Sequence, residues 1–505
     1  MQYYYTYSLL LIFCNIANCA KILGIFPCPG YSHFILGEKL FGELAKRGHE
    51  VTVISEFEPN EKIENYVTIK TKKSEPFDNE FVLTWSRANP FFLNKNFLDN
   101  GIKQSEDFLQ QKNVQEFINS NRTFDLVIVD NFINEAHMAF AEHFKAPLVV
   151  FSSQPLMEWN YHFVGNVKLP SISPHYVTAY KNQMSFFERL NNLMLSSFDF
   201  VYKELKYFPA QQALVDKYFP NKMNLKNVFT NTEMLLLFSH PLTTGPALTT
   251  SSVVEVGGFQ IESKKLPNDV QTVLDGAKNG AILVSLGTNI QCKSLSKEQL
   301  NAFLNVFRKF PQTILWKCEL EIPDKPDNLF LSKWLPQSPI LAHPNTIAFI
   351  THGGLLSVTE AIHYGVPMIT IPVFGDQIMN SVRIEKNGIA ERLDFLDLTE
   401  NKIYEAVRKV TTNPEYKKQM QRVSRIFRDQ PSKPLDRAIH TVEYVLKYKP
   451  GSLIRSPALR LWWFQLYMLD VLFFIFVFIF LFYLLISLVF RKLMFSAKQN
   501  KRKTA

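Results

Sequence analysis

Residues 351–377 decide the fold of the chain, and they run THGGLLSVTEAIHYGVPMITIPVFGDQ. Thr346–Thr351 is a mostly apolar run that predicts a buried strand, and two glycines follow it closely. Leu355–Tyr364 then predicts a helix, and Pro367–Ile371 predicts a second strand. This order predicts a parallel pair of strands, because parallel neighbours need a long connection that covers the sheet.

The same alternation of strands and helices occurs in both halves of the chain. Helices are expected at Phe34–Arg47 and around Lys297–Arg308. The further strands expected are Lys21–Phe26, Val51–Ile54, Asp125–Val129, Ala281–Ser285 and Thr313–Lys317. The sequence therefore predicts an α/β protein with two facing doubly wound, Rossmann-like domains, whose ligands bind at the carboxyl ends of the strands.

The two ends of the chain predict its topology. Residues 1–20 contain no Lys, Arg, Asp or Glu and carry an apolar stretch followed by small residues, as a cleaved signal peptide does. Val471–Phe490 contains no charge and would span roughly 30 Å as a helix, which is the thickness of a bilayer core. Only basic charges follow in residues 491–505, so this tail is expected in the cytosol and the preceding chain in the lumen.

This topology accounts for most of the formal net charge of +9. Without the six basic residues of the tail, 49 of the 55 basic residues remain against 46 acidic ones, a balance of +3. The composition thus gives no indication of a nucleic-acid partner. Lys501 and Lys503 are spaced like the dilysine signals that return membrane proteins to the endoplasmic reticulum, or else belong to a solvated basic tail.

Two further features bear on the compartment. Asn121-Arg122-Thr123 is an acceptor sequence for glycosylation in the endoplasmic reticulum. Cys28, Cys292 and Cys318 lie outside the signal segment, and they are expected to form no disulfide framework.

The turn after Thr351 is suited to bind a diphosphate. His352-Gly353-Gly354 lies between a strand and a helix, where unpaired backbone N–H groups and the positive end of the helix converge. Two glycines also allow the backbone to approach a pyrophosphate closely. A second set of N–H and hydroxyl donors is expected at another strand end, in Ser285, Gly287 and Thr288.

A base and its ribose would lie beside this turn. Trp334 offers a flat face on which uracil could stack, although a tryptophan taken alone is more often a packed core aromatic. Gln337 can both donate and accept hydrogen bonds at a base edge. Glu360 lies on the helix that starts after Gly354, where its carboxylate could accept ribose hydroxyls.

The block Trp334–Gln377 closely resembles the signature of the UDP-glycosyltransferases, which include the UDP-glucuronosyltransferases and the insect UDP-glucosyltransferases. The resemblance extends over nearly the whole chain, and His-Gly-Gly-Leu-Leu-Ser is more similar to the insect members. It implies a GT-B type pairing of the two domains. It also implies that Glu360 binds ribose and that Asp376 and Gln377 hold hydroxyls of the transferred sugar.

One position departs from the family pattern. Many relatives have Asn where this chain has Leu356, and an amide there can reach a phosphate whereas Leu356 cannot. Ser357 and the glycine backbone would then have to compensate.

Catalysis is expected from the first domain. His33 follows the first strand on a loop, and Asp130 ends another strand on the same side. A histidine held by a carboxylate is a general base near neutral pH, and the family resemblance implies that His33 deprotonates the acceptor while Asp130 orients it. Direct displacement with inversion follows. The chain has no Asp-x-Asp pair, so neither a metal nor a bound cofactor is expected, and the UDP-sugar is a co-substrate.

The resemblance assigns a role to each segment of the chain. The expected segments are a signal peptide (1–20), an acceptor-binding domain (21–240), a UDP-sugar-binding domain (241–450), a juxtamembrane segment (451–470), a transmembrane helix (471–490) and a cytosolic basic tail (491–505). Together they predict a single-pass type I protein of the endoplasmic reticulum membrane with a lumenal catalytic part.

The expected activity is transfer of a hexose, most simply from UDP-glucose, to a hydroxyl of a small lipophilic acceptor. UDP-glucuronosyl transfer, lipid glycosylation and an inactive binding protein are the alternatives, and a homo-oligomer is compatible with all of them. Ser185–Phe208, rich in Phe, Leu and Met, is either a helix that touches the membrane or part of the core.

Overall fold

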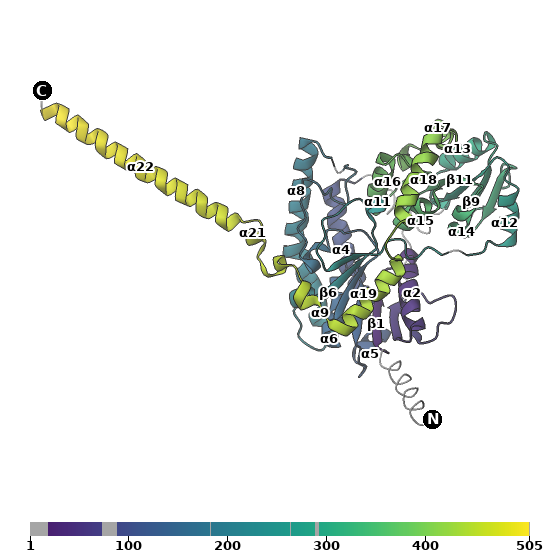
Figure 1. Cartoon of the computed structure of the whole chain (residues 1–505), viewed down its shortest axis with the longest axis horizontal. Helices are drawn as coiled ribbons and strands as arrows, with labels where there is room; N and C mark the ends of the chain where they lie inside the picture. The colour runs from purple at the N-terminus through teal and green to yellow at the C-terminus, as the bar shows by residue number, and fades with distance from the viewer. Residues whose placement is uncertain (1–18, 73–87, 182, 263, 288–291, 504–505) are drawn as a thin grey trace, which may run out of the picture. The chain divides into compact units, whose positions relative to one another are not determined.

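The computed structural model describes residues 19–72, 88–181, 183–262, 264–287 and 292–503 (Figure 1). The chain forms two compact units, Met1–Arg455 and Ser456–Ala505, and the first of them contains both sheets. Nearly all of the expected signal peptide and the candidate site residue Thr288 lie outside the described residues.

Seven parallel strands form the first sheet, in the order β3-β2-β1-β4-β5-β6-β7. The strands are β1 (Lys21–Phe26), β2 (Glu50–Ser55), β3 (Tyr66–Lys70), β4 (Leu126–Asp130), β5 (Leu148–Ser152), β6 (Thr232–Leu237) and β7 (Val253–Glu255). The helices along this part of the chain are α2 (Tyr31–Lys46), α4 (Pro90–Leu109), α5 (Lys112–Ile118), η1 (Glu135–Met138), α6 (Ala139–His143), α7 (Tyr161–Val164), α8 (Phe186–Tyr202), η2 (Lys203–Tyr207), α9 (Phe208–Tyr218), α10 (Leu225–Thr230) and α11 (Pro241–Thr244).

Six parallel strands form the second sheet, in the order β10-β9-β8-β11-β12-β13. The strands are β8 (Ala281–Ser285), β9 (Thr313–Lys317), β10 (Leu329–Ser332), β11 (Thr346–Thr351), β12 (Met368–Thr370) and β13 (Ala390–Arg392). The helices that follow α11 are α12 (Asn268–Asp275), η3 (Cys292–Ser294), α13 (Lys297–Arg308), α14 (Gln337–Ala342), α15 (Leu355–Tyr364), α16 (Asp376–Lys386), η4 (Phe395–Asp397), α17 (Glu400–Thr412), α18 (Pro414–Arg428), α19 (Pro434–Tyr448) and α20 (Gly451–Ile454).

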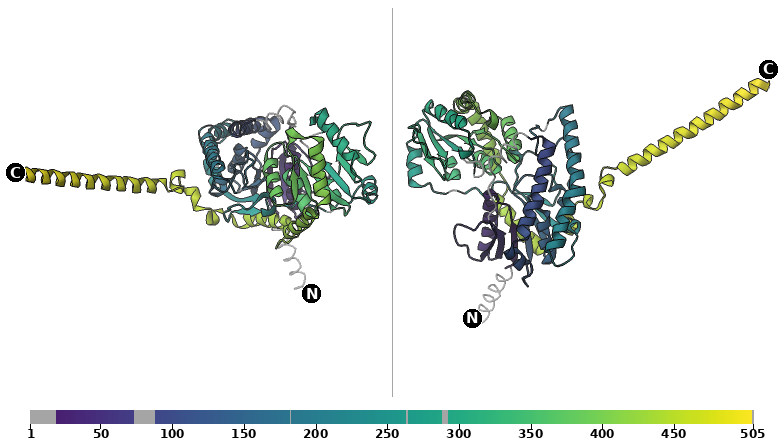
Figure 2. Two further views of the ribbon diagram at one scale, coloured as in Figure 1. Left: turned by 90° about the horizontal axis from the view of Figure 1, so that it is seen from above. Right: turned by 180° about the vertical axis from the view of Figure 1, so that it is seen from behind.

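Helices cover both faces of each sheet (Figures 1 and 2). In β4, Leu126 and Ile128 join the core beneath α2 and α19, whereas Val127 and Val129 join the core on the opposite face. This alternation follows from the period of two of a strand. The strands are almost wholly apolar because both faces are buried, and the expected fold class is therefore confirmed.

The strand orders of the two sheets determine where ligands bind. Each order reverses once, between β1 and β4 in the first sheet and between β8 and β11 in the second. At such a reversal the connections leave in opposite directions and open a crevice at the carboxyl ends of the strands. Asp130, Ser285 and His352 lie at the ends of β4, β8 and β11, and His33 lies in the first turn of α2, the helix that follows β1.

Two details differ from the sequence-based expectation. The helix α2 begins at Tyr31 rather than Phe34, so His33 lies in its first turn and not on a loop. Gly30 is extended and its carbonyl accepts the N–H of His33 at 2.9 Å, which starts the helix early. The late helix α19 packs against α2, with Ile439 and Val442 in the core of the first sheet. The first sheet also continues to β7, which lies beyond residue 240. The expected domain boundary between residues 240 and 241 stays a prediction.

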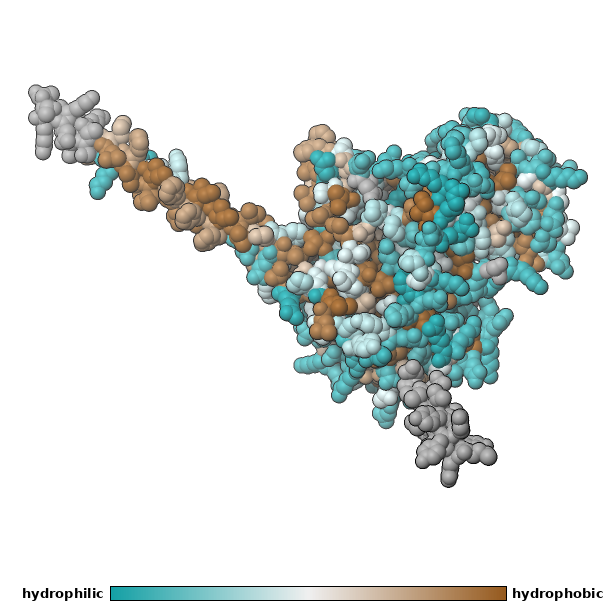
Figure 3. All heavy atoms as spheres, viewed as in Figure 1, coloured by the Kyte–Doolittle hydropathy of each residue, from teal (hydrophilic) through white to brown (hydrophobic). Residues whose placement is uncertain are grey.

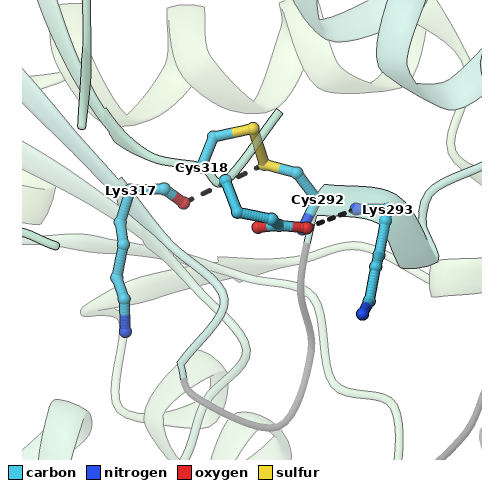
Figure 4. Close-up of a disulfide and its surroundings, with 5 residues drawn as sticks. Cys292, Lys293, Lys317 and Cys318 are labelled. Atoms are coloured by element: carbon cyan, nitrogen blue, oxygen red, sulfur yellow. Dashed lines mark hydrogen bonds between the residues drawn. A yellow bond between two sulfur atoms is a disulfide. The ribbon is translucent and has the colours of Figure 1, made fainter. Parts of the chain in front are cut away.

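The expectation of a chain without disulfides is wrong. Cys292 and Cys318 are joined by a disulfide, with their Cα atoms 5.4 Å apart (Figure 4). The bond ties η3 to the residue that follows β9. The carboxylate of Glu319 accepts the backbone N–H of Cys292 at 3.1 Å and that of Lys293 at 2.8 Å, which fixes the same junction.

The second unit contains η5 (Pro457–Arg460), α21 (Trp463–Leu466) and α22 (Leu469–Lys503). Leu469–Phe495 is long and apolar enough to cross a membrane, with a mean hydropathy of 3.1, and it includes the expected span 471–490 (Figure 3). It is the only such helix among the described residues.

Candidate active site

His33 and Asp130 form the centre of the first-domain site. The imidazole Nδ1 lies 2.8 Å from Oδ2 of Asp130, although the two residues are 97 positions apart in the sequence. His33 is 6% exposed and Asp130 is fully buried. Because Nδ1 is engaged by the carboxylate, Nε2 is the nitrogen that remains for an acceptor hydroxyl.

Ser153 completes this group and was not anticipated from the sequence. Its hydroxyl lies 2.5 Å from Oδ1 of Asp130 and 2.6 Å from Nδ1 of His33, and its backbone N–H donates to the same Oδ1 at 3.3 Å. Ser153 directly follows β5, the strand that pairs with β4. Ser153 could have been identified in advance by recognising that the ends of β4 and β5 are adjacent.

The charge state of His33 is set by its surroundings. Burial disfavours the imidazolium, but the sulfur of Cys28 and the carboxylate of Asp130 favour it, and together they raise the pKa of His33 well above its ordinary value. An imidazole of raised pKa accepts a proton readily, which suits a general base.

An aromatic cluster begins at one side of the histidine. The ring of Phe132 meets the imidazole edge-on with centroids 4.9 Å apart, and Phe97 and Trp159 pack on Phe132 at 5.5 and 5.7 Å. Tyr176 packs on both Phe97 and Trp159, at 5.4 and 5.3 Å. One side of the His33 imidazole is therefore apolar.

In the second domain, the turn after β11 has the expected geometry for an anion. Gly353 has a φ of +80°, and a Cβ there would lie 2.4 Å from Oγ of Ser381, so only glycine fits. Gly354 is the N-cap of α15 and no side chain caps the helix. The first turn of α15 therefore offers backbone N–H groups to a ligand, although that of Leu355 also interacts with the carboxylate of Asp376.

The imidazole of His352 lies between Gly354 and the turn after β8. A Cβ on Gly354 would lie 2.4 Å from its Nε2, and a Cβ on Gly287 would lie 2.6 Å from its Cε1. Gly287 has a φ of +89°, and its N–H donates to the buried hydroxyl of Ser285 at 3.4 Å. The glycines predicted at both strand ends thus meet around one histidine.

Lys317, at the end of β9, adds a cation that the sequence did not reveal. Its Nζ donates to the carbonyl of Gly287 at 3.1 Å. Burial and the charge of Lys317 lower the pKa of His352 to about 4, so the imidazole is neutral in the free protein. The position of Lys317 beside β8 is the signal that could have identified it.

The residues expected around the base and ribose also cluster. Nε2 of Gln337 donates to Oγ of Ser357 at 3.0 Å and to Oε2 of Glu360 at 2.7 Å. Burial raises the pKa of Glu360 to about 7, although the Gln337 amide partly offsets this effect. Trp334 is 66% exposed, which excludes the interpretation as a core aromatic.

Asp376 and Gln377 begin α16. Asp376 accepts from Nδ2 of Asn380 at 2.7 Å, and this amide also donates to the carbonyl of Gly353 at 3.2 Å. Asn380 thus links the glycine turn to Asp376. Oε1 of Gln377 accepts the backbone N–H groups of Val373 and Phe374, at 2.9 and 3.2 Å. A sugar contact by Gln377 would therefore use Nε2.

Leu356, which stands where many relatives have Asn, has a packing role in this structure. Its side chain packs against the core of the first sheet together with Leu355, and it does not serve the glycine turn.

Helix α16 lies against the first domain near His33. Its Met379 packs in the same buried cluster as Ile133 and Trp159, and Phe132 packs against this cluster. Burial raises the pKa of Asp376, and the charge of His33 partly offsets this effect.

Two Rossmann-like sheets in this arrangement make up the GT-B fold. The solved structures that share it include two glycosyltransferases. The calicheamicin glycosyltransferase CalG4 has a TM-score of 0.58 and 20% identity, over 85% of this chain and 98% of its own. A UDP-glucosyltransferase from Polygonum tinctorium has a TM-score of 0.58 and 17% identity, over 85% and 98%.

The chain belongs to the family described as UDP-glucoronosyl and UDP-glucosyl transferase, whose model matches residues 20–503. It is similar to UDP-glycosyltransferase UGT5 of Dactylopius coccus, with 31% identity over 94% of this chain and 92% of that protein. It is equally similar to human UDP-glucuronosyltransferase 2B7, with 31% identity over 94% of each chain. The protein is thus a UDP-glycosyltransferase that uses a UDP-sugar as co-substrate.

Proposed function

We propose that the protein transfers glucose from UDP-glucose to a hydroxyl group of a small lipophilic acceptor, with inversion at the anomeric carbon. The observation that carries this proposal is the hydrogen-bonded group of His33, Asp130 and Ser153, in a domain against which α16, the helix that begins at Asp376, packs through Met379. The aromatic residues around His33 support an apolar acceptor. The glucose donor rests on the insect-like motif His-Gly-Gly-Leu-Leu-Ser at residues 352–357.

In the proposed reaction, Nε2 of His33 takes the proton as the acceptor O–H bond breaks. The acceptor oxygen forms a bond to the anomeric carbon, while the bond from that carbon to the phosphate oxygen breaks and its electrons leave with UDP. Asp130 stabilises the imidazolium that results. Backbone N–H groups after Gly354, with His352 and Lys317, stabilise the charge that develops on UDP.

Ser153 has a positioning role in this scheme. Its O–H and N–H both point at Oδ1 of Asp130, which leaves Oδ2 to hold the imidazole. The carboxylate, and through it the histidine, is then fixed before the substrate binds. Such preorganisation lowers the cost of reaching the reactive geometry.

We also propose a type I orientation in the endoplasmic reticulum membrane, with the catalytic part in the lumen. The disulfide between Cys292 and Cys318 supports an oxidising compartment. Asn121 is exposed and accessible to glycosylation. Substitution Asn121→Gln is expected to remove the shift in mobility that an endoglycosidase causes in the wild-type protein.

The activity is tested with microsomes that contain the protein, radiolabelled UDP-glucose and a panel of phenols. His33→Ala is expected to reduce transfer by about 10²–10⁴-fold, because the general base is lost, while the affinity for UDP-glucose stays within about twofold. His440→Ala, which removes an exposed histidine of α19, is the matched control and is expected to have no effect.

The outcomes separate the alternatives. A His33→Ala protein that retains most of its turnover would contradict the assignment of the base. Wild-type protein that binds UDP-sugars but transfers to no acceptor would favour an inactive binding protein. Transfer from UDP-glucuronate but not from UDP-glucose would contradict the proposed donor.

A further inference from the structure

The helix α8 buries mostly polar side chains and exposes apolar ones, which is the reverse of the usual arrangement. The residues that it buries are Asn192, Leu195 and Asp199, two of which are polar. The large apolar side chains that α8 and η2 expose, by 41 to 77%, are Phe186, Phe187, Leu190, Leu193, Met194, Phe200, Val201 and Leu205. A helix on the surface of a globular domain normally turns its apolar face inward.

Buried hydrogen bonds fix this orientation. Asn192 donates to the carbonyls of Pro170 and Ser173 at 2.7 and 3.0 Å and accepts the N–H of His175 at 2.8 Å. Asp199 accepts from the buried Nζ of Lys203 at 2.8 Å. Rotation of the helix would bury its apolar face only by breaking the bonds of Asn192, whereas the Asp199–Lys203 bond lies within the helix and would move with it. The bonds of Asn192 therefore specify the outward apolar face.

The exposed apolar residues form one continuous face. Their spacing of three or four residues places them in a stripe along the helix, which Figure 3 shows in brown over α8. The charged side chains on the same helix and turn outside the buried pair are Glu188, Arg189, Glu204 and Lys206. These two acidic and two basic side chains carry no net charge together, so a partner would be bound through apolar contact and not through charge.

The covalent connection to the apolar helix α22 indicates the partner. The guanidinium of Arg455 donates to the carbonyl of Asn231 at 2.9 Å and to Glu233 at 3.3 Å, which fixes the end of the first unit. Residues 456–468 then lead to Leu469, the first residue of the apolar helix. A connection of this length reaches at most about 45 Å, so a bilayer that holds α22 is always close to the domain.

We propose that the apolar face of α8 inserts into the lumenal interface of the bilayer that α22 spans, and that it does so through neutral phospholipid. This inference rests on the proposed membrane anchoring. An interfacial helix with a balanced polar side binds in proportion to its buried apolar area. The same helix contacts the acceptor domain near His175, which adjoins the aromatic cluster that leads through Tyr176 to His33.

The test uses the full chain with a protease site placed after Ser456, reconstituted in phosphatidylcholine vesicles. After cleavage, the released first unit is expected to stay with the vesicles, also in 1 M NaCl. Substitution of Phe187, Leu193 and Met194 by Ser is expected to lower its vesicle partition at least about tenfold. The matched control replaces three exposed apolar residues elsewhere, Val67, Leu396 and Ile426, by Ser and is expected to leave partition unchanged.

Full release of the wild-type unit, or equal retention of the triple variant, overturns the proposal. So does a released unit that is dimeric and becomes monomeric on substitution, because a second copy then covers the face. The uncleaved sample reports on α22 separately, and UDP-glucose transfer reports on the active site. Should the triple variant not fold, Phe187→Trp is expected to be quenched by brominated phosphatidylcholine and Ile426→Trp is not, and equal quenching overturns the proposal.

Discussion

The substitution Ser153→Ala tests the organisation of the first-domain site most sharply. It removes the hydroxyl that lies 2.5 Å from Oδ1 of Asp130 and 2.6 Å from Nδ1 of His33, but it keeps the backbone N–H at 3.3 Å from the same oxygen. A hydrogen bond to a charged group contributes about 1.5–3 kcal/mol. Because one donor remains, the lower part of this range applies, and about 1.5–2 kcal/mol corresponds to a loss of about 10–30-fold in kcat.

The assay is steady-state transfer from UDP-glucose, with the thermal midpoint of unfolding measured in parallel. If Ser153 only positions Asp130, the fall is in kcat, while the KM for UDP-glucose stays unchanged, since the donor is bound by the other domain. Ser153→Thr keeps a hydroxyl and is expected to recover most of the rate. A loss that appears in the donor KM, or that Thr does not relieve, would refute the reasoning.

Three further predictions follow from other parts of the structure. The raised pKa of His33 implies that kcat/KM increases with pH through a value above the ordinary 6.5, because the base must be unprotonated, and a limb below 6.5 in the pH–rate profile would disagree. Replacing Cys292 and Cys318 by Ser is expected to cost about 3.5 kcal/mol of unfolding free energy, from the 26-residue separation that the disulfide closes, and denaturant titration without loss of stability would disprove this. Gln377→Ala is expected to raise the KM for the donor about fivefold, because the N–H of Val373 loses its acceptor. One such hydrogen bond contributes about 1 kcal/mol, and about 1.4 kcal/mol would correspond to tenfold. Unaltered donor kinetics would show that this loop is not needed.

The sequence determined the sheets and the ends of their central strands. Lys21–Phe26, Ala281–Ser285 and Thr346–Thr351 were predicted at their observed limits, because a strand buried on both faces is an uninterrupted apolar run. The motif residues at these strand ends followed from the same patterns and from the family resemblance. Their convergence required the strand order, which periodicity does not give.

Residues that act through neighbours in space were not predictable. Ser153, Lys317 and Asn380 have ordinary sequence surroundings, and their contacts exist only because β5 lies beside β4, β9 beside β8 and α16 beside the glycine turn. The disulfide was missed for a similar reason, since two cysteines 26 positions apart carry no spacing signature. The Phe, Leu and Met content of Ser185–Phe208 left membrane contact and core packing open, and only the buried partners of Asn192 determine which face of α8 is outside.

The central claim is that a UDP-sugar extends from the glycine turn of the second domain to the imidazole of the first. A structure of the full chain with UDP-2-deoxy-2-fluoroglucose, a donor that reacts slowly, tests it directly. We expect the diphosphate within hydrogen-bonding distance of the backbone N–H groups after Gly354 and the anomeric carbon on the side of Nε2 of His33. A diphosphate bound away from that turn, or a sugar directed away from His33, would contradict the account.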